Sequence, residues 1–299
     1  MTGFSRTAAI LSAIALGSLI PQAHIFSPAI RWLVIAMLFL VFLQTRFNRS
    51  ALNIRHFTLL AANIAMGLAA WGFGSMVGGR DIGLASFFCG ITPTAIAAPV
   101  IISFLRGRVE FVVAAFVLTN LTIAALLPLL LPLVLGRATP EAFGQVAGSV
   151  GVVVFAPMVL ALLVRRLHPP AAAWPGQHRN LSFGMWVVSM FLITSNASHF
   201  LHVQSATPQL VLAQIAGTSL AICAANFALG RLIGGKEFAR EASQALGQKN
   251  TTFTIYLALA YASPVVALGP TFYVIWHNLW NSWQLHVAGR RQARERASA

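Results

Sequence analysis

The sequence predicts an all-α polytopic membrane protein with ten transmembrane helices, arranged as two inverted repeats of five in which helices 4 and 9 are interrupted. Composition is the first observation behind this prediction, because 58% of the 299 residues are hydrophobic and only 9% are charged. A soluble domain has about a quarter of its residues charged. The other two observations are the spacing of the apolar runs and the polar breaks at matching places in the two halves.

Apolar runs of spanning length divide the chain into ten candidate helices. The runs are cut at charges and at Pro or Gly, and a crossing needs about 20 predominantly apolar residues. The expected helices cover residues 7–21, 28–45, 57–78, 84–105, 110–135, 144–167, 181–201, 208–233, 240–262 and 264–288.

Basic residues predict the side on which each loop lies. Apart from Lys249 they gather in the tails and the even-numbered loops, and the odd-numbered loops hold only Arg31, Arg80 and Arg137. The positive-inside rule then places both termini in the cytoplasm of a protein of the cell (inner) membrane. This clustering accounts for the net charge of +14 without a nucleic-acid partner. The basic tail 290–299 is expected to be a solvated anchor that touches the lipid bilayer.

The first apolar run has a second interpretation, as a signal peptide. It combines one arginine, an apolar core and small residues near Gln22 and Ala23. A mature chain starting near His24 would keep nine crossings, and one repeat would lose a member.

Polar residues interrupt the ninth run at QALGQKNTT, residues 244–252. At about 1.5 Å per residue and a hydrocarbon core about 30 Å thick, Lys249 and Asn250 are expected near the bilayer midplane. An ionisable group at that depth is costly and usually functional. The alternative is a lysine that snorkels to the headgroups, for which its side chain is short.

Ten crossings divide the chain into two halves of five helices, residues 1–136 and 137–289. Because five is odd, the second half starts on the opposite side of the membrane from the first and therefore has inverted topology. Run 4 is then the partner of run 9, and its middle carries Gly90 and Pro93. Proline cannot donate a backbone hydrogen bond, so this helix is also expected to break at mid-depth. Interrupted helices at matching positions of two halves indicate a transport site.

Polar side chains on four runs reach the same depth and form the predicted substrate site. Each alone would be explained by a helix-to-helix hydrogen bond, worth about 0.6–2 kcal/mol in membranes, but their coincidence in depth favours a site. Its predicted members are Thr92, Thr94, Asn120, Gln244, Gln248, Lys249, Asn250, His277 and Asn278.

The chain resembles the bile acid:sodium symporter family, ten-span carriers of organic anions. Three passages carry the resemblance: GITPTAIAAPVIISFLRGRVEF from Gly90, QKN from Gln248, and SPVVALGPTFYVIWHN from Ser263. The resemblance implies a core domain of helices 3–5 and 8–10, in which helices 4 and 9 unwind and cross. It also implies a panel domain of helices 1, 2, 6 and 7, and transport by alternating access.

The sequence departs from the sodium-coupled members of that family. Ligands of one sodium site fall on Ala98 and Pro99, with further ones near Val112 and Phe116, and the Glu-to-Gln pair of helix 9 falls on Gln244 and Gln248. Hard cations prefer several oxygen ligands, usually including an anionic one. Sodium coupling is therefore in doubt, and no metal or other cofactor is expected.

Lys249 then supplies part of the positive charge that sodium supplies in the relatives. A buried lysine can release its proton and a bound anion would hold it charged, which leaves proton coupling open. The alternative is a lysine that caps the C-terminus of a half-helix.

The residues also bear on two other functions. An intramembrane enzyme needs paired carboxylates, a metal cluster or an activated nucleophile, and all six acids fall near helix ends or in tails. Arsenite extrusion through Cys89 is the other, although a lone buried cysteine is more often packing. The sequence favours a carrier of a small organic anion, not an enzyme.

Overall fold

The computed structural model describes residues 3–45, 51–203 and 209–297, and within these ranges the chain is helical nearly throughout, with no β-strand. Three short non-α segments also occur, η1 (Pro21–Phe26), η3 (Gly151–Phe155) and η4 (Pro169–Ala173). The α-helices are α1 (Gly3–Leu19), α2 (Ala29–Gln44), α3 (Ile54–Ile91), α4 (Ala97–Phe104), α5 (Val109–Val134), α6 (Pro140–Val150), α7 (Ala156–Leu167), α8 (Trp174–Gln177), α9 (Arg179–Val203), α10 (Gln209–Gly234), α11 (Ala239–Gly247), α12 (Thr251–Tyr261) and α13 (Pro264–Ala297).

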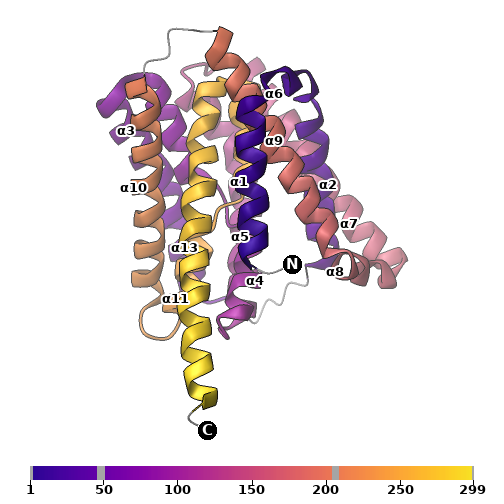
Figure 1. Cartoon of the computed structure of the whole chain (residues 1–299). Coiled ribbons are helices and arrows are strands. Elements are labelled where there is room, and N and C mark those ends of the chain that lie inside the picture. The colour runs from indigo at the N-terminus through magenta and orange to yellow at the C-terminus, as the bar shows by residue number, and fades with distance from the viewer. Residues whose placement is uncertain (1–2, 46–50, 204–208, 298–299) are drawn as a thin grey trace.

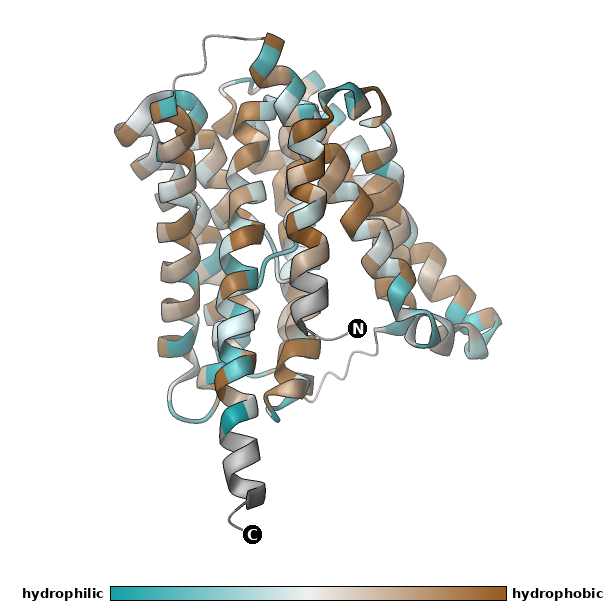
Figure 2. Cartoon of the chain, viewed as in Figure 1, coloured by the Kyte–Doolittle hydropathy of each residue, from teal (hydrophilic) through white to brown (hydrophobic). Residues whose placement is uncertain are grey.

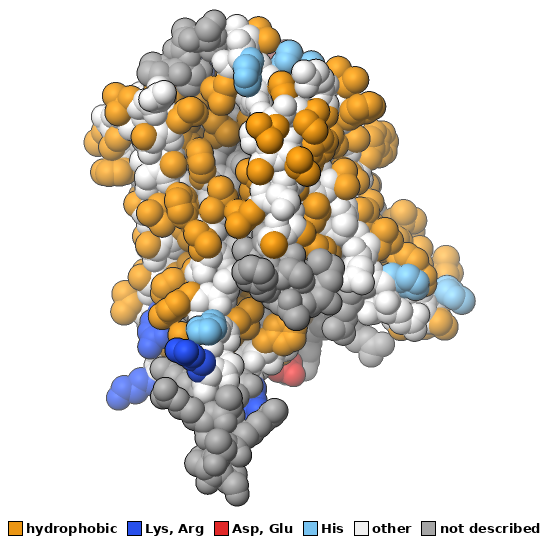
Figure 3. Space-filling model, in the orientation of Figure 1, with side chains coloured by type: hydrophobic (Ala, Val, Ile, Leu, Met, Phe, Trp, Pro, Cys, Tyr) orange, Lys and Arg blue, Asp and Glu red, His pale blue; other side chains and the backbone are white. Residues whose placement is uncertain are grey.

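Five helical stretches of the described chain are long and apolar enough to cross a membrane: Ile54–Ile91, Val109–Val134, Pro140–Leu167, Asn180–Val203 and Gln209–Gly234. On the face drawn in Figure 3, hydrophobic side chains run along the lengths of the helices, and Lys and Arg side chains gather toward the lower end. Figure 2 likewise shows mostly hydrophobic residues along the helices. Met76, for example, is 87% exposed. Such a surface suits lipid and not water, so the chain is an all-α protein compatible with a membrane.

The 38-residue helix α3 folds back on itself at Gly78 and Gly79. Gly79 has φ +78, a conformation that costs glycine little. A Cβ added at Gly90 would lie 2.7 Å from the Cα of Gly67, whereas 23 residues of straight helix would separate them by about 35 Å. Small residues thus let the two arms of α3 pack closely, and the second arm leads toward α4.

The helices pack in two groups (Figure 1). In the first, α1 packs against α9, and α2 against α7 and α9. In the second, α3 packs against α10, α13 and α5, while α11 packs against α10, α5 and α4. Contacts of α13 with α9 and of α12 with α2 join the groups. The start of α1 and the end of α13 both point toward the lower side of Figure 1.

The structure departs from the sequence expectation at the start of one run and along the C-terminal tail. The run 144–167 begins earlier, at Pro140 after the N-cap Thr139, and continues through the π-helical turn η3. The last expected helix ended at residue 288, whereas α13 continues through the basic tail as far as Ala297. Its Arg, Gln, Glu and Ala residues are good helix formers, so α13 continues beyond its apolar part.

Candidate functional site

The first helix interruption separates α3 from α4 and lies at Pro93. α3 ends at Ile91, Thr92 has the extended backbone that a following proline favours (ψ 130), and α4 begins only at Ala97. The expected break at mid-run is therefore present. Because its backbone groups no longer bond within a helix, they need partners from elsewhere in the molecule.

The second interruption separates α11 from α12 and spans Gln248 to Asn250. α11 ends at Gly247, where a Cβ would overlap the ring of Phe227, and Gln248 is extended (φ −86, ψ 105). α12 begins at Thr251. Close packing of Gly247 against α10 leaves no room for a larger residue at this helix end.

The two interruptions lie against each other and exchange backbone hydrogen bonds. The N–H of Ala95 donates to the Gln248 carbonyl at 2.8 Å, and the N–H of Asn250 donates to the Pro93 carbonyl at 2.9 Å. These bonds flank an antiparallel bridge between Thr94 and Lys249. Each non-helical segment thereby supplies hydrogen-bond partners for backbone groups of the other. Backbone groups inside a membrane need such partners from within the protein.

The ammonium of Lys249 caps the C-terminal end of α3. Its side chain is 2% exposed, and Nζ donates to the side-chain oxygen of Asn63 and, at 3.2 Å, to the Gly90 carbonyl. The Asn63 amide nitrogen donates in turn to the Ile91 carbonyl at 2.9 Å. A helix C-terminus carries partial negative charge, so a cation is favourable there. No carboxylate in the described residues bonds this ammonium.

Hydroxyl and amide groups of α5 hold the first interruption in place. Thr94 Oγ1 donates to the Ala245 carbonyl at 2.6 Å and accepts from Thr119 Oγ1 at 3.0 Å. Asn120 Nδ2 donates to the Thr94 carbonyl at 2.8 Å. Thr94 and Asn120, both predicted site residues, are therefore brought together, and both are buried.

Thr92 joins the two broken helices from the other side of the crossing. Its hydroxyl lies 2.8 Å from that of Thr254 on α12 and also bonds the Phe88 carbonyl. Thr254 was not among the predicted site residues, although it lies one helical turn beyond Asn250.

Four amide side chains, three of them buried and Gln284 half-buried, form a chain between the second interruption and α13. Gln244 Nε2 donates to Asn281 Oδ1 at 2.9 Å and to Gln284 Oε1 at 2.7 Å, and Asn281 Nδ2 donates to Gln248 Oε1 at 2.5 Å. Gln244 and Gln248 are thus connected through Asn281, which sequence reasoning missed. The available signal was its spacing of four residues from His277, which places the two on one helix face.

The side chains of the remaining predicted residues, His277, Asn278 and Asn250, differ in their hydrogen bonding. His277 is 1% exposed, and neither of its ring nitrogens has a partner among the described residues. The Asn278 amide turns back to the Val274 carbonyl of its own helix at 2.7 Å. Asn250 bonds through its backbone N–H to Pro93. Neighbouring residues on a helix lie about 100° apart, so His277 and Asn278 cannot both face the crossing.

The positions where the resemblance would place sodium ligands are buried among apolar side chains. Ala98 and Val112 belong to one buried hydrophobic cluster and Phe116 to another. Pro99 is buried as well. Cys89 and Cys223 are free thiols that share a third buried cluster with Tyr273, and no group of metal-ligating residues occurs within residues 3–45, 51–203 and 209–297.

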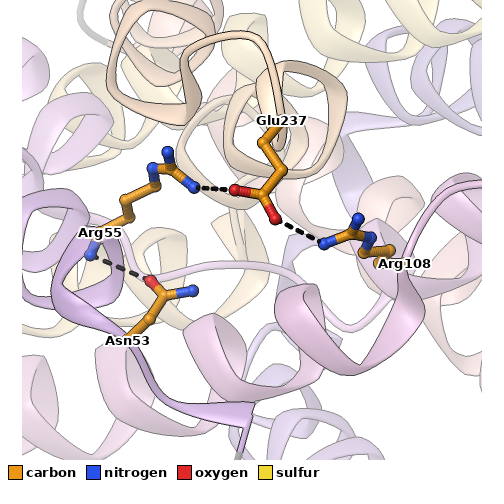
Figure 4. Close-up of polar contacts among 4 residues, drawn as sticks. All are labelled: Asn53, Arg55, Arg108 and Glu237. Carbon is orange, nitrogen blue, oxygen red and sulfur yellow. Dashed lines mark hydrogen bonds and ion pairs between the residues drawn. The ribbon is translucent and has the colours of Figure 1, made fainter.

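An ion-pair cluster ties the lower ends of the same helices together outside the crossing (Figure 4). Glu237, between α10 and α11, accepts from Arg55 at 3.0 Å and from Arg108 at 2.9 Å. Both guanidinium groups also lie over the Phe238 ring. Hydrogen bonds from Arg55, and then Arg108, hold the pKa of the Glu237 carboxyl below its usual value.

Comparison with known families and proteins adds no assignment. No family model matches the chain, and no curated protein matches it.

Proposed function

We propose that the protein is a secondary transporter that moves a small organic anion across the membrane by alternating access. The observation that carries the proposal is the meeting of two broken helices at a buried ammonium, Lys249. Irregular backbone inside a membrane persists where it lines a site or a cavity, and discontinuous helices of this kind form the substrate sites of many transporters.

Positive charge at the crossing supports an anionic substrate. Besides Lys249, the starts of α4 and α12 point their N–H groups toward the interruptions, and neither start is capped by a side chain. Helix N-termini favour anions because of their free donors and partial positive charge. The unpartnered His277 imidazole supports a polar ligand, because a buried polar group without a partner is destabilising.

The ten-crossing inverted-repeat topology is part of the proposal, as is membership of the bile acid:sodium symporter family as a divergent member. Counting the two arms of α3 separately, and joining α3 to α4 and α11 to α12 across the interruptions, places helical segments on all ten expected runs. In this scheme the group around α3, α10 and α13 is the core, and the group around α1, α2, α7 and α9 is the panel. Both tails are cytoplasmic.

Transport is proposed to be independent of sodium. The first candidate sodium site is filled by apolar side chains around Ala98, Val112 and Phe116, and Lys249 places a tethered cation at the second interruption. Because substrate and proton would each favour the charged lysine, their binding would reinforce each other. Proton coupling is therefore the proposed alternative to sodium coupling.

The test is a thermal-shift screen of purified protein against organic acids, with sodium or choline as the only added cation. A ligand stabilises in proportion to RT ln(1 + [L]/Kd). At least one organic anion should raise the melting temperature equally in both salts, and His277→Ala should reduce that shift while keeping the unliganded melting temperature close to wild type. Stabilisation that requires sodium would contradict sodium independence, and the absence of any stabilising acid would contradict the anion site.

Topology is tested separately with a reporter fused after Arg296. A cytoplasmic signal is expected, and a periplasmic signal would exclude the ten-crossing scheme.

Extrusion of arsenite through Cys89 remains the second candidate, because Cys223 lies in the same buried cluster. Trivalent arsenic prefers thiolate ligands, as soft ions do. If this function holds, expression should raise the arsenite resistance of cells, and Cys89→Ala should abolish the gain. Unchanged resistance on expression would exclude it.

A further inference from the structure

An open depression of about 440 Å³ lies on the surface where α10 turns into α11, and this hollow is lined by Arg231, Leu232, Gly235, Lys236 and Ala239. The turn is tight because Gly235 adopts φ +60 and Gly234 lies directly against α11, where an added Cβ would be 2.9 Å from the Cα of Ala239. The backbone at this turn is therefore closely packed, and Arg231 and Lys236 line the hollow above it.

The two cations of this hollow, Arg231 and Lys236, have no partner in the described protein. Neither forms a hydrogen bond or an ion pair there, and both are exposed. The nearest acid in sequence, Glu237, is bound to Arg55 and Arg108 instead (Figure 4). Lys and Arg side chains gather at this lower end of the molecule, below the hydrophobic surface (Figure 3). The hollow thus presents uncompensated positive charge.

An apolar side chain borders the same hollow. Leu232 is 76% exposed and lies on α10, one of the helices long and apolar enough to cross a membrane. Positive charge directly beside an exposed apolar side chain, at the end of such a helix, matches a molecule with an anionic head and hydrocarbon chains. A soluble anion would use the charges but gain nothing from Leu232.

We propose that this hollow binds the phosphate of an anionic phospholipid, held between Arg231 and Lys236 with an acyl chain beside Leu232. A basic residue near an anionic leaflet contributes about 1 kcal/mol, and basic pockets at the ends of membrane helices are suited to lipid headgroups. The site depends on the membrane location of the chain and not on its transport substrate. Through the α10–α11 turn, the lipid would anchor α11, the helix that leads to Lys249, at the membrane surface.

The experiment measures lipid binding to the delipidated full chain in a neutral detergent. Phosphatidylglycerol and phosphatidylcholine with identical acyl chains are titrated, with native mass spectrometry counting bound lipids and the melting temperature recorded in parallel. Wild-type protein should bind phosphatidylglycerol in preference and gain thermal stability from it. The double variant Arg231→Gln/Lys236→Gln should bind it about 10- to 30-fold more weakly, because two charges of about 1 kcal/mol each are lost.

The matched control removes the same charge from exposed basic residues elsewhere in the described chain, as Arg106→Gln/Arg166→Gln. The proposal expects this control to keep most of the phosphatidylglycerol affinity, and equal losses in the two double variants would overturn the site in favour of diffuse attraction. Stabilisation of wild type by inorganic phosphate as strong as that by phosphatidylglycerol would also overturn it, since the occupant would then be a soluble anion. Leu232→Asn, which leaves every charge in place, should weaken the lipid without changing any response to phosphate.

Discussion

Both helix interruptions leave backbone carbonyl groups without partners inside the helix, but different side chains bond these carbonyls at the two places. At the first, the carbonyls that end α3 accept hydrogen bonds from Lys249, an ionisable side chain, and from Asn63. At the second, the end of α11 receives only neutral donors: the Tyr273 hydroxyl bonds the Gly247 carbonyl at 2.9 Å, and Thr94 bonds that of Ala245. The pair is alike in backbone bonding and unlike in charge.

The comparison shows which side chains are sufficient to bond the carbonyl groups at the end of a broken helix. Neutral hydroxyl groups are sufficient to satisfy the end of a broken helix, as α11 demonstrates. A buried ammonium carries a desolvation penalty of several kcal/mol even after relaxation, and Lys249 has no carboxylate bonded to it to offset this penalty. The charge therefore exceeds what capping needs, which is the physical argument for a functional role. The following predictions test that asymmetry.

The largest effect is expected from Lys249→Gln on substrate binding. A hydrogen bond to a charged group contributes about 1.5–3 kcal/mol, so affinity for the organic anion should fall about 10- to 100-fold. The measurement is ligand-induced thermal shift across several pH values in sodium-free buffer. Wild-type affinity should depend on pH and that of the variant should not. Equal affinity and an equal pH profile in the two proteins would leave Lys249 as a cap alone.

Asn63→Leu is expected to give the next largest effect, on stability. The variant removes an acceptor from the Lys249 ammonium and a donor from the Ile91 carbonyl, and leaving buried groups unpaired costs about 1–3 kcal/mol. The melting temperature in detergent should fall accordingly. An unchanged melting temperature for Asn63→Leu would contradict the bonds to Lys249 and to the Ile91 carbonyl.

Thr94→Val tests the contact that both interruptions share. It removes the bonds to Ala245 and Thr119 while keeping the side-chain volume, so a loss of about 1–2 kcal/mol of stability is expected. Thr119→Val and the double variant complete a cycle. A coupling energy near zero between Thr94 and Thr119 would contradict the hydrogen-bonded arrangement.

Tyr273→Phe should have a smaller effect, because the cap of α11 is neutral. Hydrogen bonds between membrane helices average about 0.6 kcal/mol, and the variant retains the buried ring. Thermal stability should fall slightly, and substrate affinity should stay close to wild type. Affinity loss as large as that of Lys249→Gln would remove the distinction between the charged and the neutral cap.

The sequence predicted those features whose cause is local. Gly90 and Pro93 in the middle of an apolar run predicted the first break, and the polar run around Lys249 predicted the second. The direction of Gln244 was not predictable, because it depends on where α13 places Asn281. Asn63 was missed although it is a polar side chain in an apolar run.

Contacts between distant runs could not be predicted from the local sequence pattern. The backbone bridge between Thr94 and Lys249 joins residues 155 positions apart in sequence, so only the family resemblance gave a reason to expect the crossing. Tyr273 was missed because a tyrosine in an apolar helix gives no indication of which carbonyl its hydroxyl will reach.

The smallest effect is expected from Glu237→Gln, and it compares charge in water with charge at the crossing. Glu237 is exposed, so solvent screens its bonds to Arg55 and Arg108. Because these arginines lower its pKa in the folded protein, its stabilising contribution is present above the ordinary value of 4.5 and is lost as pH falls through the lower folded pKa. Wild type should therefore melt slightly above the variant at pH 7, and the two melting temperatures should converge in acid. In an Arg55→Gln/Arg108→Gln background the same substitution should have no effect at any pH. A persistent difference in that background would assign the effect to something other than the ion pairs, whereas a difference at pH 7 larger than that of Asn63→Leu would contradict the greater importance of buried charge.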